Sequence, residues 1–279
     1  MLKKIFNQLL HLSEEYLALL SEENCRLCRQ EIIKPVLKDD SFKGNTSLAF
    51  VNLNLDSDYF RNYFKVSQTI CNYCLAKAYP DKVFLTTYDL IDDHVLTVLS
   101  ATQYKGYAKW LIYKLKYLKD SLIAIDLAVF LLKAWLRLKP IISNEISSDN
   151  YLIVPVPLHP KKLKERGYNQ TSKLGQNLSR LINVPFSSKA IIKIKPTKSQ
   201  QGLSREDRLI NLNGAFIGKK EIVKDKTILL IDDVITTGST LKACSQALYK
   251  AGAKSVYGLT PAISLRYKQF DTTAKLTQP

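Results

Sequence analysis

The sequence lacks the features that would place the chain in a membrane or outside the cell. It has no uninterrupted apolar run of about eighteen residues, the length from which a membrane-spanning helix is predicted. The lysines and apolar residues at its start are interrupted by Glu14 and Glu15 before any signal core or cleavage site. Cysteine is scarce, with five in 279 residues, four of them in two CxxC pairs. That usage fits a cytosolic metal site better than a disulfide framework, so we expect a cytoplasmic protein.

Acidic residues are also few. Lys and Arg number 41 against 25 Asp and Glu, which gives a net charge of +16. This excess indicates a polyanionic partner, nucleic acid first and a phosphorylated substrate second. A proteome rich in lysine would produce the same balance, so charge alone does not decide the function.

The most informative stretch is residues 228–240. Four apolar residues, typical of a buried parallel strand, precede Asp232 and Asp233, and a hydroxyl-rich turn then leads to a helix predicted from Leu241. Ligands of open α/β sheets bind at the carboxyl ends of strands, and helix N-termini bind phosphate. The pattern predicts a ligand with a phosphate at one end and hydroxyls or a divalent cation beside the acids. The alternative is an ordinary surface turn with a helix cap.

This stretch resembles the 5-phosphoribosyl-1-pyrophosphate (PRPP) signature of type I phosphoribosyltransferases. The resemblance implies that Asp232 and Asp233 bind the ribose hydroxyls, with Mg²⁺ nearby. It also implies that the turn binds the 5-phosphate through Thr236, Thr237, Gly238, Ser239 and Thr240.

The N-terminal region predicts a packed helix over residues 1–20, followed by a metal module. Two CxxC turns can present four thiolates to one structural Zn²⁺, and the candidate ligands are Cys25, Cys28, Cys71 and Cys74. The 42 residues from 29 to 70 exceed the usual ribbon spacing, which predicts an insertion inside the module. Free buried thiols or a redox pair are the alternatives.

Two strands, 83–90 and 94–104, are predicted to form a hairpin across Asp92 and Asp93. The next segment, 104–119, interleaves lysines with aromatic rings and holds no acid, as a single-stranded nucleic-acid site does. The candidate DNA contacts are Tyr104, Lys105, Tyr107, Lys109, Lys114, Lys116 and Tyr117. The alternative is that a helical stripe packs as core, comprising Tyr107, Trp110, Leu111, Leu115 and Leu118. A second, buried helix over 121–138 is predicted to end at Pro140.

The C-terminal half predicts a strand over 151–154, a basic loop, a helix from Gln170 to about 182 and a strand over 191–195. The basic loop, with Lys161, Lys162, Lys164 and Arg166, is well placed for pyrophosphate, although a solvated surface loop would have the same composition. The polar segment 198–208 is a candidate lid that brings Arg205 and Arg208 over the pyrophosphate, or else a plain connecting loop. A helix over 241–250 and a strand over 255–259 follow.

An ordered set of motifs extends the resemblance to most of the chain. The set comprises both CxxC pairs, Tyr104-Lys-Gly, Leu115-Lys-Tyr117, Val154-Pro-Val-Pro-Leu-His159, Arg166-Gly-Tyr-Asn-Gln170 and Gln201-Gly-Leu-Ser-Arg-Glu-Asp-Arg208. It is similar to the ComF family of competence-associated, amidophosphoribosyltransferase-like proteins. The resemblance implies a cytoplasmic bacterial protein with a PRPP site that serves DNA uptake in natural transformation, with single-stranded DNA and competence-machinery proteins as partners.

The expected architecture is α/β. Residues 1–100 would hold the N-terminal helix and the four-cysteine zinc module, 101–265 a type I phosphoribosyltransferase-like parallel sheet flanked by helices, and 266–279 a tail. Two functions stay open: a phosphoribosyltransferase of unknown acceptor, and a non-catalytic protein that senses PRPP or a nucleotide and binds single-stranded DNA. No residue stands out as a general base. No glutaminase domain is apparent and the first residue is not the Cys nucleophile of such a domain, which argues against glutamine-dependent transfer.

Overall fold

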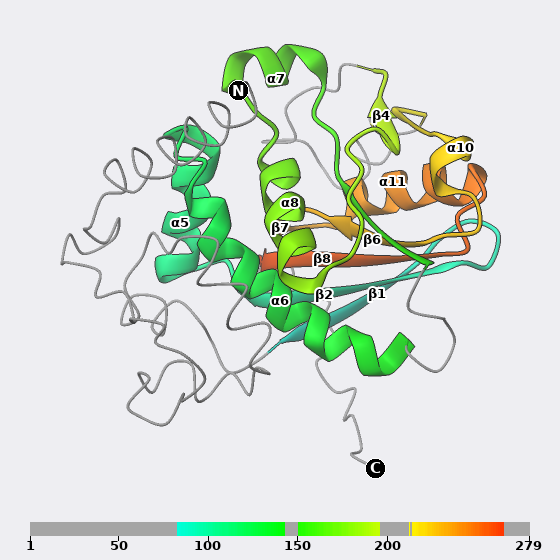
Figure 1. The fold of residues 1–279 in the computed structure, drawn as a ribbon, viewed down its shortest axis with the longest axis horizontal. Helices are drawn as coiled ribbons and strands as arrows, with labels where there is room; N and C mark the ends of the chain where they lie inside the picture. Colours follow the sequence, from blue (N-terminus) through cyan, green and yellow to red (C-terminus); the bar gives the residue numbers. More distant parts are fainter. Residues whose placement is uncertain (1–82, 143–149, 196–211, 213, 265–279) are drawn as a thin grey trace, which may run out of the picture.

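A mixed six-stranded sheet forms the centre of the molecule, and helices cover both of its faces (Figure 1). The computed structural model describes residues 83–142, 150–195, 212 and 214–264. The sheet order is β1 (Phe84–Asp89), β2 (Val95–Gln103), β8 (Ser255–Ile263), β6 (Thr227–Ile231) and β3 (Tyr151–Pro155), and β7 (Val234–Ile235) pairs with the end of β8. All neighbours run parallel except β1 and β2. The predicted α/β class with a parallel sheet is confirmed.

The antiparallel pair β1–β2 is the predicted hairpin. Its turn places Asp92 and Asp93 at φ 61° and 56°, a left-handed region that Asp tolerates better than most residues. The backbone N–H of Leu90 donates to the carbonyl of His94 and closes the loop. Because β2 pairs with β8, the hairpin belongs to the main sheet, and the domain boundary expected after residue 100 falls inside β2.

Three helices cover one face of the sheet: α5 (Gly106–Tyr117), α6 (Ile123–Ile142) and α8 (Gln170–Ile182). Most of α6 is buried, and it packs against α8 and the sheet. The helix does not end before Pro140, as the sequence predicted, but continues to Ile142. A proline in the last turn removes few intrahelical hydrogen bonds, and the burial of Leu138 and Ile142 holds that turn against the core.

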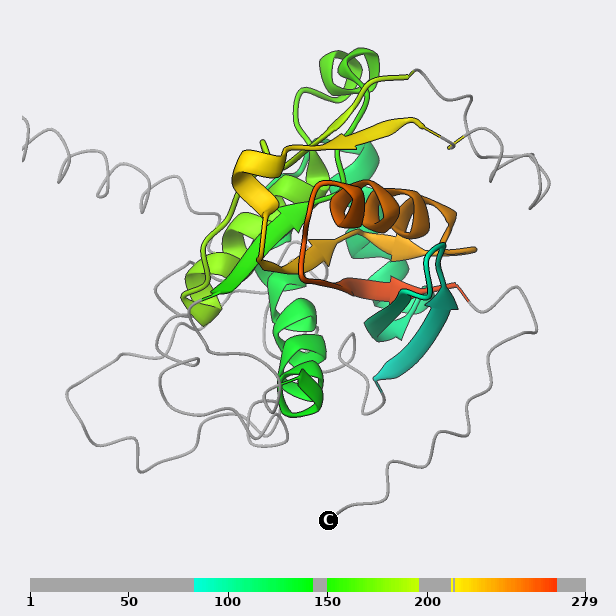
Figure 2. The same ribbon diagram turned by 90° about the vertical axis from the view of Figure 1, so that its right-hand side faces the viewer.

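The opposite face carries α11 (Ser239–Lys250), α10 (Lys220–Val223) and a small second sheet (Figure 2). That sheet pairs β4 (Ile191–Lys193) with β5 (Phe216–Gly218) in antiparallel register, so the predicted strand over 191–195 is shorter and lies outside the main sheet. No helix within the described ranges combines the length and apolar character that a membrane span requires.

A short helix, α7 (Pro160–Arg166), stands where the sequence predicted a basic loop. The imidazole of His159 accepts a hydrogen bond from the backbone N–H of Lys161, and Pro160 fits the first helical position. Gly167 ends the helix at φ 85°, a left-handed cap that glycine adopts without strain. Because the segment is helical, its cationic side chains project in different directions.

Candidate functional site

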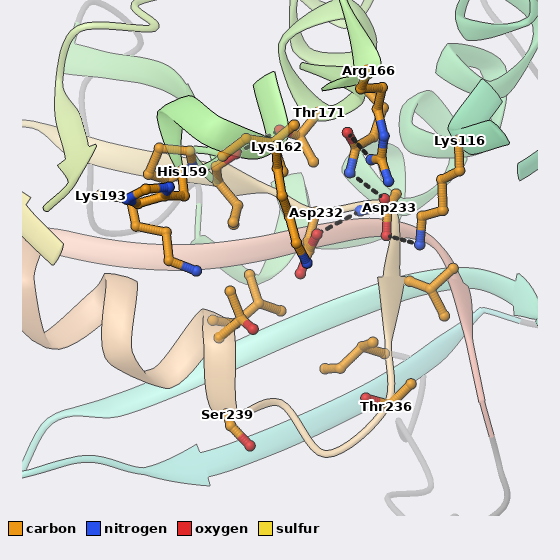
Figure 3. A pocket seen from close by; sticks show the side chains of 18 of the residues that line it. Lys116, His159, Lys162, Arg166, Thr171, Lys193, Asp232, Asp233, Thr236 and Ser239 are labelled. Carbon is orange, nitrogen blue, oxygen red and sulfur yellow. Dashed lines mark hydrogen bonds and ion pairs between the residues drawn. The ribbon is translucent and has the colours of Figure 1, made fainter. Parts of the chain in front are cut away.

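One pocket of about 720 Å³ opens where β3 and β6 end (Figure 3). Its walls come from α5, from the chain between β3 and α8, from β4, and from the segment that joins β6 to α11. The carboxyl ends of parallel strands are the usual ligand position of such sheets, and the volume lies in the range of small-molecule pockets. The fold therefore collects polar groups from distant parts of the sequence at one cavity.

The predicted phosphate-binding turn forms the floor of this pocket. All five of its residues, Thr236, Thr237, Gly238, Ser239 and Thr240, line the cavity, and α11 begins at Ser239. The hydroxyls of Thr237 and Ser239 lie 2.6 Å apart, and the backbone N–H of Ser239 donates to Thr237 Oγ1 at 3.4 Å. The first turn of a helix has backbone N–H groups without intrahelical partners, which suits a phosphate.

Gly238 gives this turn its shape. Its φ of 75° is left-handed, and a Cβ at this position would lie 2.5 Å from Cζ of the Tyr88 ring on β1. Both the backbone conformation and the close approach of the ring therefore require glycine.

The two acids of the motif occupy different environments. Asp233 is 4 % exposed, whereas Asp232 is partly exposed in the pocket. Both oxygens of Asp233 have partners: Oδ1 lies 2.7 Å from Lys116 Nζ, and Oδ2 accepts from Gln170 Nε2 at 2.7 Å. Asp232 Oδ1 accepts from the backbone N–H of Asp233 at 2.8 Å. Asp233 is thus fixed by the protein, and Asp232 is the acid with more access to a ligand.

Burial and charge set the protonation of this cluster. Burial, followed by repulsion from Asp233, raises the pKa of Asp232 to about 7, against the opposing effects of Lys116 and a backbone hydrogen bond. Burial, the largest single effect, would lower the pKa of Lys116, but the charge and hydrogen bond of Asp233, together with Asp232 and Tyr104, raise that pKa overall. Lys116 is therefore a charged partner of the acid pair.

Two of the four predicted pyrophosphate cations line the pocket. Lys162 points from α7 toward the acid pair, and Arg166 lies at the end of the same helix (Figure 3). Lys161 and Lys164 lie on the exposed side of α7, outside the lining. Arg205 and Arg208 lie outside the described residues, so their predicted role in a lid stays a prediction.

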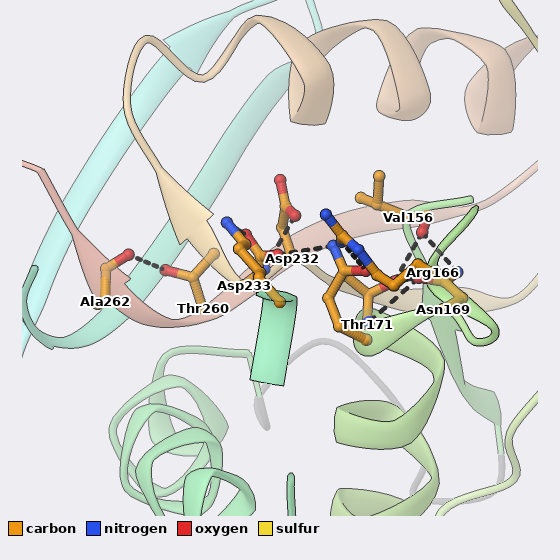
Figure 4. A network of polar contacts seen from close by, with 10 residues as sticks. Val156, Arg166, Asn169, Thr171, Asp232, Asp233, Thr260 and Ala262 are labelled. Carbon is orange, nitrogen blue, oxygen red and sulfur yellow. Dashed lines mark hydrogen bonds and ion pairs between the residues drawn. The ribbon is translucent and has the colours of Figure 1, made fainter. Parts of the chain in front are cut away.

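A polar network fixes the start of α8 beside the acids (Figure 4). The carbonyl of Val156 accepts from Asn169 Nδ2 at 3.0 Å and from Thr171 Oγ1 at 2.7 Å. Arg166 Nη1 donates to Gln170 Oε1 at 2.5 Å, and Gln170 in turn donates to Asp233. These bonds connect Arg166, at the end of α7, to Asp233.

The sequence reasoning missed several lining residues. Lys193 reaches the pocket from β4, and burial, with nearby Lys162, lowers its pKa. His159 lines the wall before α7, and Gln170 holds Asp233. The motifs that contain His159 and Gln170 were both recognised in the sequence. Their positions in the pocket could not be predicted, because they depend on contacts between elements.

The residues predicted to contact DNA fall into two groups, one in the pocket and one at the surface. Three of its candidate residues, Tyr104, Lys116 and Tyr117, line the pocket. Lys105, Tyr107 and Lys109 are exposed, and Lys114 is partly buried. Lys116 therefore faces the acids rather than open solvent.

The alternative core stripe is confirmed at two of its five residues and wrong at the other three. Leu111 and Leu115 are buried, but Tyr107, Trp110 and Leu118 are exposed. The rings instead form an exposed row: Trp110 and Tyr113 have centroids 5.5 Å apart, and Tyr113 and Tyr117 are 5.1 Å apart. Lys114 Nζ lies 5.6 Å from the Trp110 ring centroid, so one cation lies beside the row of rings.

The four predicted zinc ligands, Cys25, Cys28, Cys71 and Cys74, lie outside the described residues. Within residues 83–142, 150–195, 212 and 214–264, no group of three His, Cys, Asp or Glu residues could hold a metal by itself. Cys244 is buried in the core.

Comparison with known proteins gives a consistent set of matches. The phosphoribosyl transferase domain family matches residues 172–262. DNA utilization protein YhgH of Escherichia coli O157:H7 is 32 % identical over 187 residues, covering 67 % of this chain and 74 % of that protein. Competence protein F of Haemophilus influenzae is 43 % identical over 115 residues, covering 39 % of this chain and 50 % of that protein. Competence protein ComFC of Streptococcus pneumoniae is 32 % identical over 116 residues, covering 41 % and 50 %. The chain thus spans half the length of the two competence proteins.

Proposed function

The chain belongs to the ComF family of phosphoribosyltransferase-like proteins, and from that premise we propose that its pocket binds PRPP or a closely related sugar phosphate. One observation carries the proposal: the helix-start turn of residues 236–240 and Asp232 line the same cavity as Lys162, Arg166 and Lys193. A ligand with a phosphate at one end, ribose hydroxyls in the middle and pyrophosphate at the other end matches this order of groups.

The site suits phosphoribosyl transfer. In such a step the acceptor's electron pair forms a bond to C1 of the ribose while the bond from C1 to the pyrophosphate oxygen breaks, and its electrons leave with pyrophosphate. Lys162 and Arg166 would stabilise the leaving charge, and Asp232 would orient the ribose. The acid pair fits Mg²⁺, which usually takes one or two carboxylates together with substrate phosphates and would neutralise pyrophosphate when bound.

Calorimetry with PRPP tests the pocket. Replacing both acids, Asp232→Ala with Asp233→Ala, should abolish PRPP binding while near-UV circular dichroism stays native. Asp225→Ala, which removes an exposed carboxylate, should bind like the wild type. Unchanged affinity in the double variant would refute the site.

Pyrophosphate release separates the two functions that the pocket supports. PRPP would be incubated with the full chain and with bases or ammonia as acceptors. Release that depends on one acceptor identifies a transferase, and it should disappear in the double acid variant. Binding without release for any acceptor identifies a PRPP-sensing protein.

The exposed ring row supports a second role, in which the protein binds single-stranded DNA during DNA uptake in the cytoplasm. Two relatives are named competence protein F and DNA utilization protein, and these names support a role with DNA. Trp110, Tyr113 and Tyr117 offer exposed rings for bases, and Lys114 beside them suits a phosphate backbone. Contact with other competence proteins belongs to the same proposal.

Fluorescence anisotropy with a labelled oligothymidylate tests the DNA role. Trp110→Ser with Tyr113→Ser should weaken binding at least about tenfold, since stacking contributes about 1–3 kcal/mol per base. Ile217→Ser removes an exposed apolar side chain at β5 and should change nothing. Affinity that ignores both the ring substitutions and added salt would contradict the proposal.

A further inference from the structure

Lys116 places a positive charge next to the two acids of the pocket. It comes from the last turn of α5, outside the matched residues 172–262, and its Nζ lies 2.7 Å from Asp233 Oδ1. The two side chains are 19 % and 6 % exposed, so water screens the pair only weakly. Lys116 is therefore a built part of the pocket rather than a surface cation.

The helix that carries Lys116 is fastened to the pocket wall. The hydroxyl of Tyr168 donates to the carbonyl of Leu115 at 2.5 Å, one residue before Lys116. On the other side, the guanidinium of Arg166 lies 5.8 Å from the Tyr117 ring centroid. These contacts hold the end of α5 that carries Lys116 against the pocket wall, and the ion pair with Asp233 places its ammonium.

Charge in the pocket favours an anion even without a metal ion. Two adjacent carboxylates repel each other and would repel a phosphorylated ligand, and Lys116 cancels one of those charges. The whole lining has five cationic and three acidic residues: Lys116, Lys119, Lys162, Arg166 and Lys193 against Glu165, Asp232 and Asp233. Without Lys116 the acid pair would depend on a divalent cation to offset its charge.

We propose that Lys116 is a positioning residue that holds Asp233 and replaces part of the charge neutralisation supplied by Mg²⁺, so that the pocket binds PRPP without a divalent cation. The inference rests on the proposed PRPP site. It assigns distinct roles to the acids: Asp233 anchors Lys116 and Gln170, and Asp232 meets the ribose.

Calorimetry of the full chain with PRPP tests this, with Mg²⁺ and in buffer depleted of divalent cations on a chelating resin. No soluble chelator is added, so that zinc bound elsewhere in the chain stays in place. The wild-type Kd should change less than about threefold on Mg²⁺ removal, whereas Lys116→Met should lose at least about tenfold without Mg²⁺ and recover most of that loss with it. Lys250→Met makes the same charge change at the far end of α11 and should behave like the wild type.

The outcomes are distinct. A wild-type protein that binds PRPP with Mg²⁺ but loses more than about tenfold without it overturns this inference and leaves the proposed function standing. Equal affinities of wild type and Lys116→Met in both buffers also overturn it. A wild-type protein that binds PRPP in neither buffer overturns the proposed function. If Lys116→Met does not fold, Lys116→Arg, which keeps the charge, should retain metal-free binding, and the wild-type measurement remains decisive.

Discussion

At the scale of single residues, Asp232 combines a ligand-binding position with a cost in stability. Its pKa is raised from 3.8 to about 7, so the folded state keeps a proton that the unfolded state releases between these values. The free energy of unfolding therefore falls as pH rises from about 4 to about 7 and then levels off. Such a cost is common where a binding site needs a charge that the fold disfavours.

Asp232→Asn removes this titration. In ligand-free buffer without Mg²⁺, the variant's melting temperature should match the wild type near pH 4 and exceed it by several degrees at pH 8, while PRPP affinity falls. Thermal unfolding followed by circular dichroism measures the difference. The control Asp225→Asn changes a carboxylate that is 80 % exposed. The difference between its melting temperature and that of the wild type should hardly vary with pH. The same gap at both pH values for Asp232→Asn would contradict the raised pKa.

Gly238→Ala should lower the free energy of unfolding by more than the strain of a left-handed backbone alone would. The variant meets both the strain of φ 75° and the ring of Tyr88. Gly252→Ala is the matched control, because φ is 92° there but the nearest atom lies 3.5 Å away. Urea unfolding should show a loss of about 1–2 kcal/mol for the control and a larger loss, with weakened PRPP binding, for Gly238→Ala. Equal losses would exclude the steric contribution.

The local motifs of the site were predictable, and the long-range partners were not. The strand, the acids and the turn are consecutive, so the sequence predicted that they form one site, and residues 232–240 do line the pocket. The pairing of Lys116 with Asp233 joins α5 to the end of β6, and no local pattern encodes it. The sequence analysis placed Lys116 among the candidate DNA contacts, whereas the fold pairs it with Asp233 in the pocket.

At the scale of elements, α5 shows why periodicity was insufficient. Rings at Tyr107, Trp110, Tyr113 and Tyr117 and aliphatic side chains from Ala108 to Leu115 each follow a helical spacing, on different faces. The predicted core stripe mixed rings with leucines, whereas the fold buries only aliphatic side chains of α5 and leaves the rings exposed.

The helix α6 should be the most sensitive element to loss of side-chain volume. Leu127 is fully buried in the core shared by α5, α8 and the sheet, so Leu127→Ala should lower the free energy of unfolding by about 2–5 kcal/mol. Leu122→Ala, at a side chain that is 48 % exposed just before α6, should cost less than about 0.5 kcal/mol. Urea titration compares the two, and equal midpoints would show that α6 does not hold the core together.

At the scale of the whole molecule, we propose that the chain carries one structural zinc in addition to its pocket. Cys71→Ser should abolish the zinc, measured by elemental analysis, and lower the melting temperature, because a site of four cysteine thiolates contributes directly to folding. Cys244→Ser is the control, since Cys244 is buried in the core and belongs to neither CxxC pair. A native protein without metal and with unchanged stability would refute the zinc module.

The parallel sheet followed from the sequence because apolar runs and turn signals mark its strands one by one. The extent of the sheet did not follow from the sequence, because strand order depends on pairing: β2 lies beside β8, the last described element of the chain. A boundary near residue 100 therefore looked reasonable along the chain and cuts through the sheet in space.

The packing of α5 and α6 against the sheet determines which fragments of the protein can fold. A fragment trimmed to residues 172–262 would lack β1, β2 and β3, the helix α6 that fills one side of the core, and the pocket residues Lys116, Lys162 and Arg166. The stretch that sequence similarity marks as a domain is thus smaller than the unit that can fold. Expression of a working pocket needs the chain from at least β1 to the end of β8.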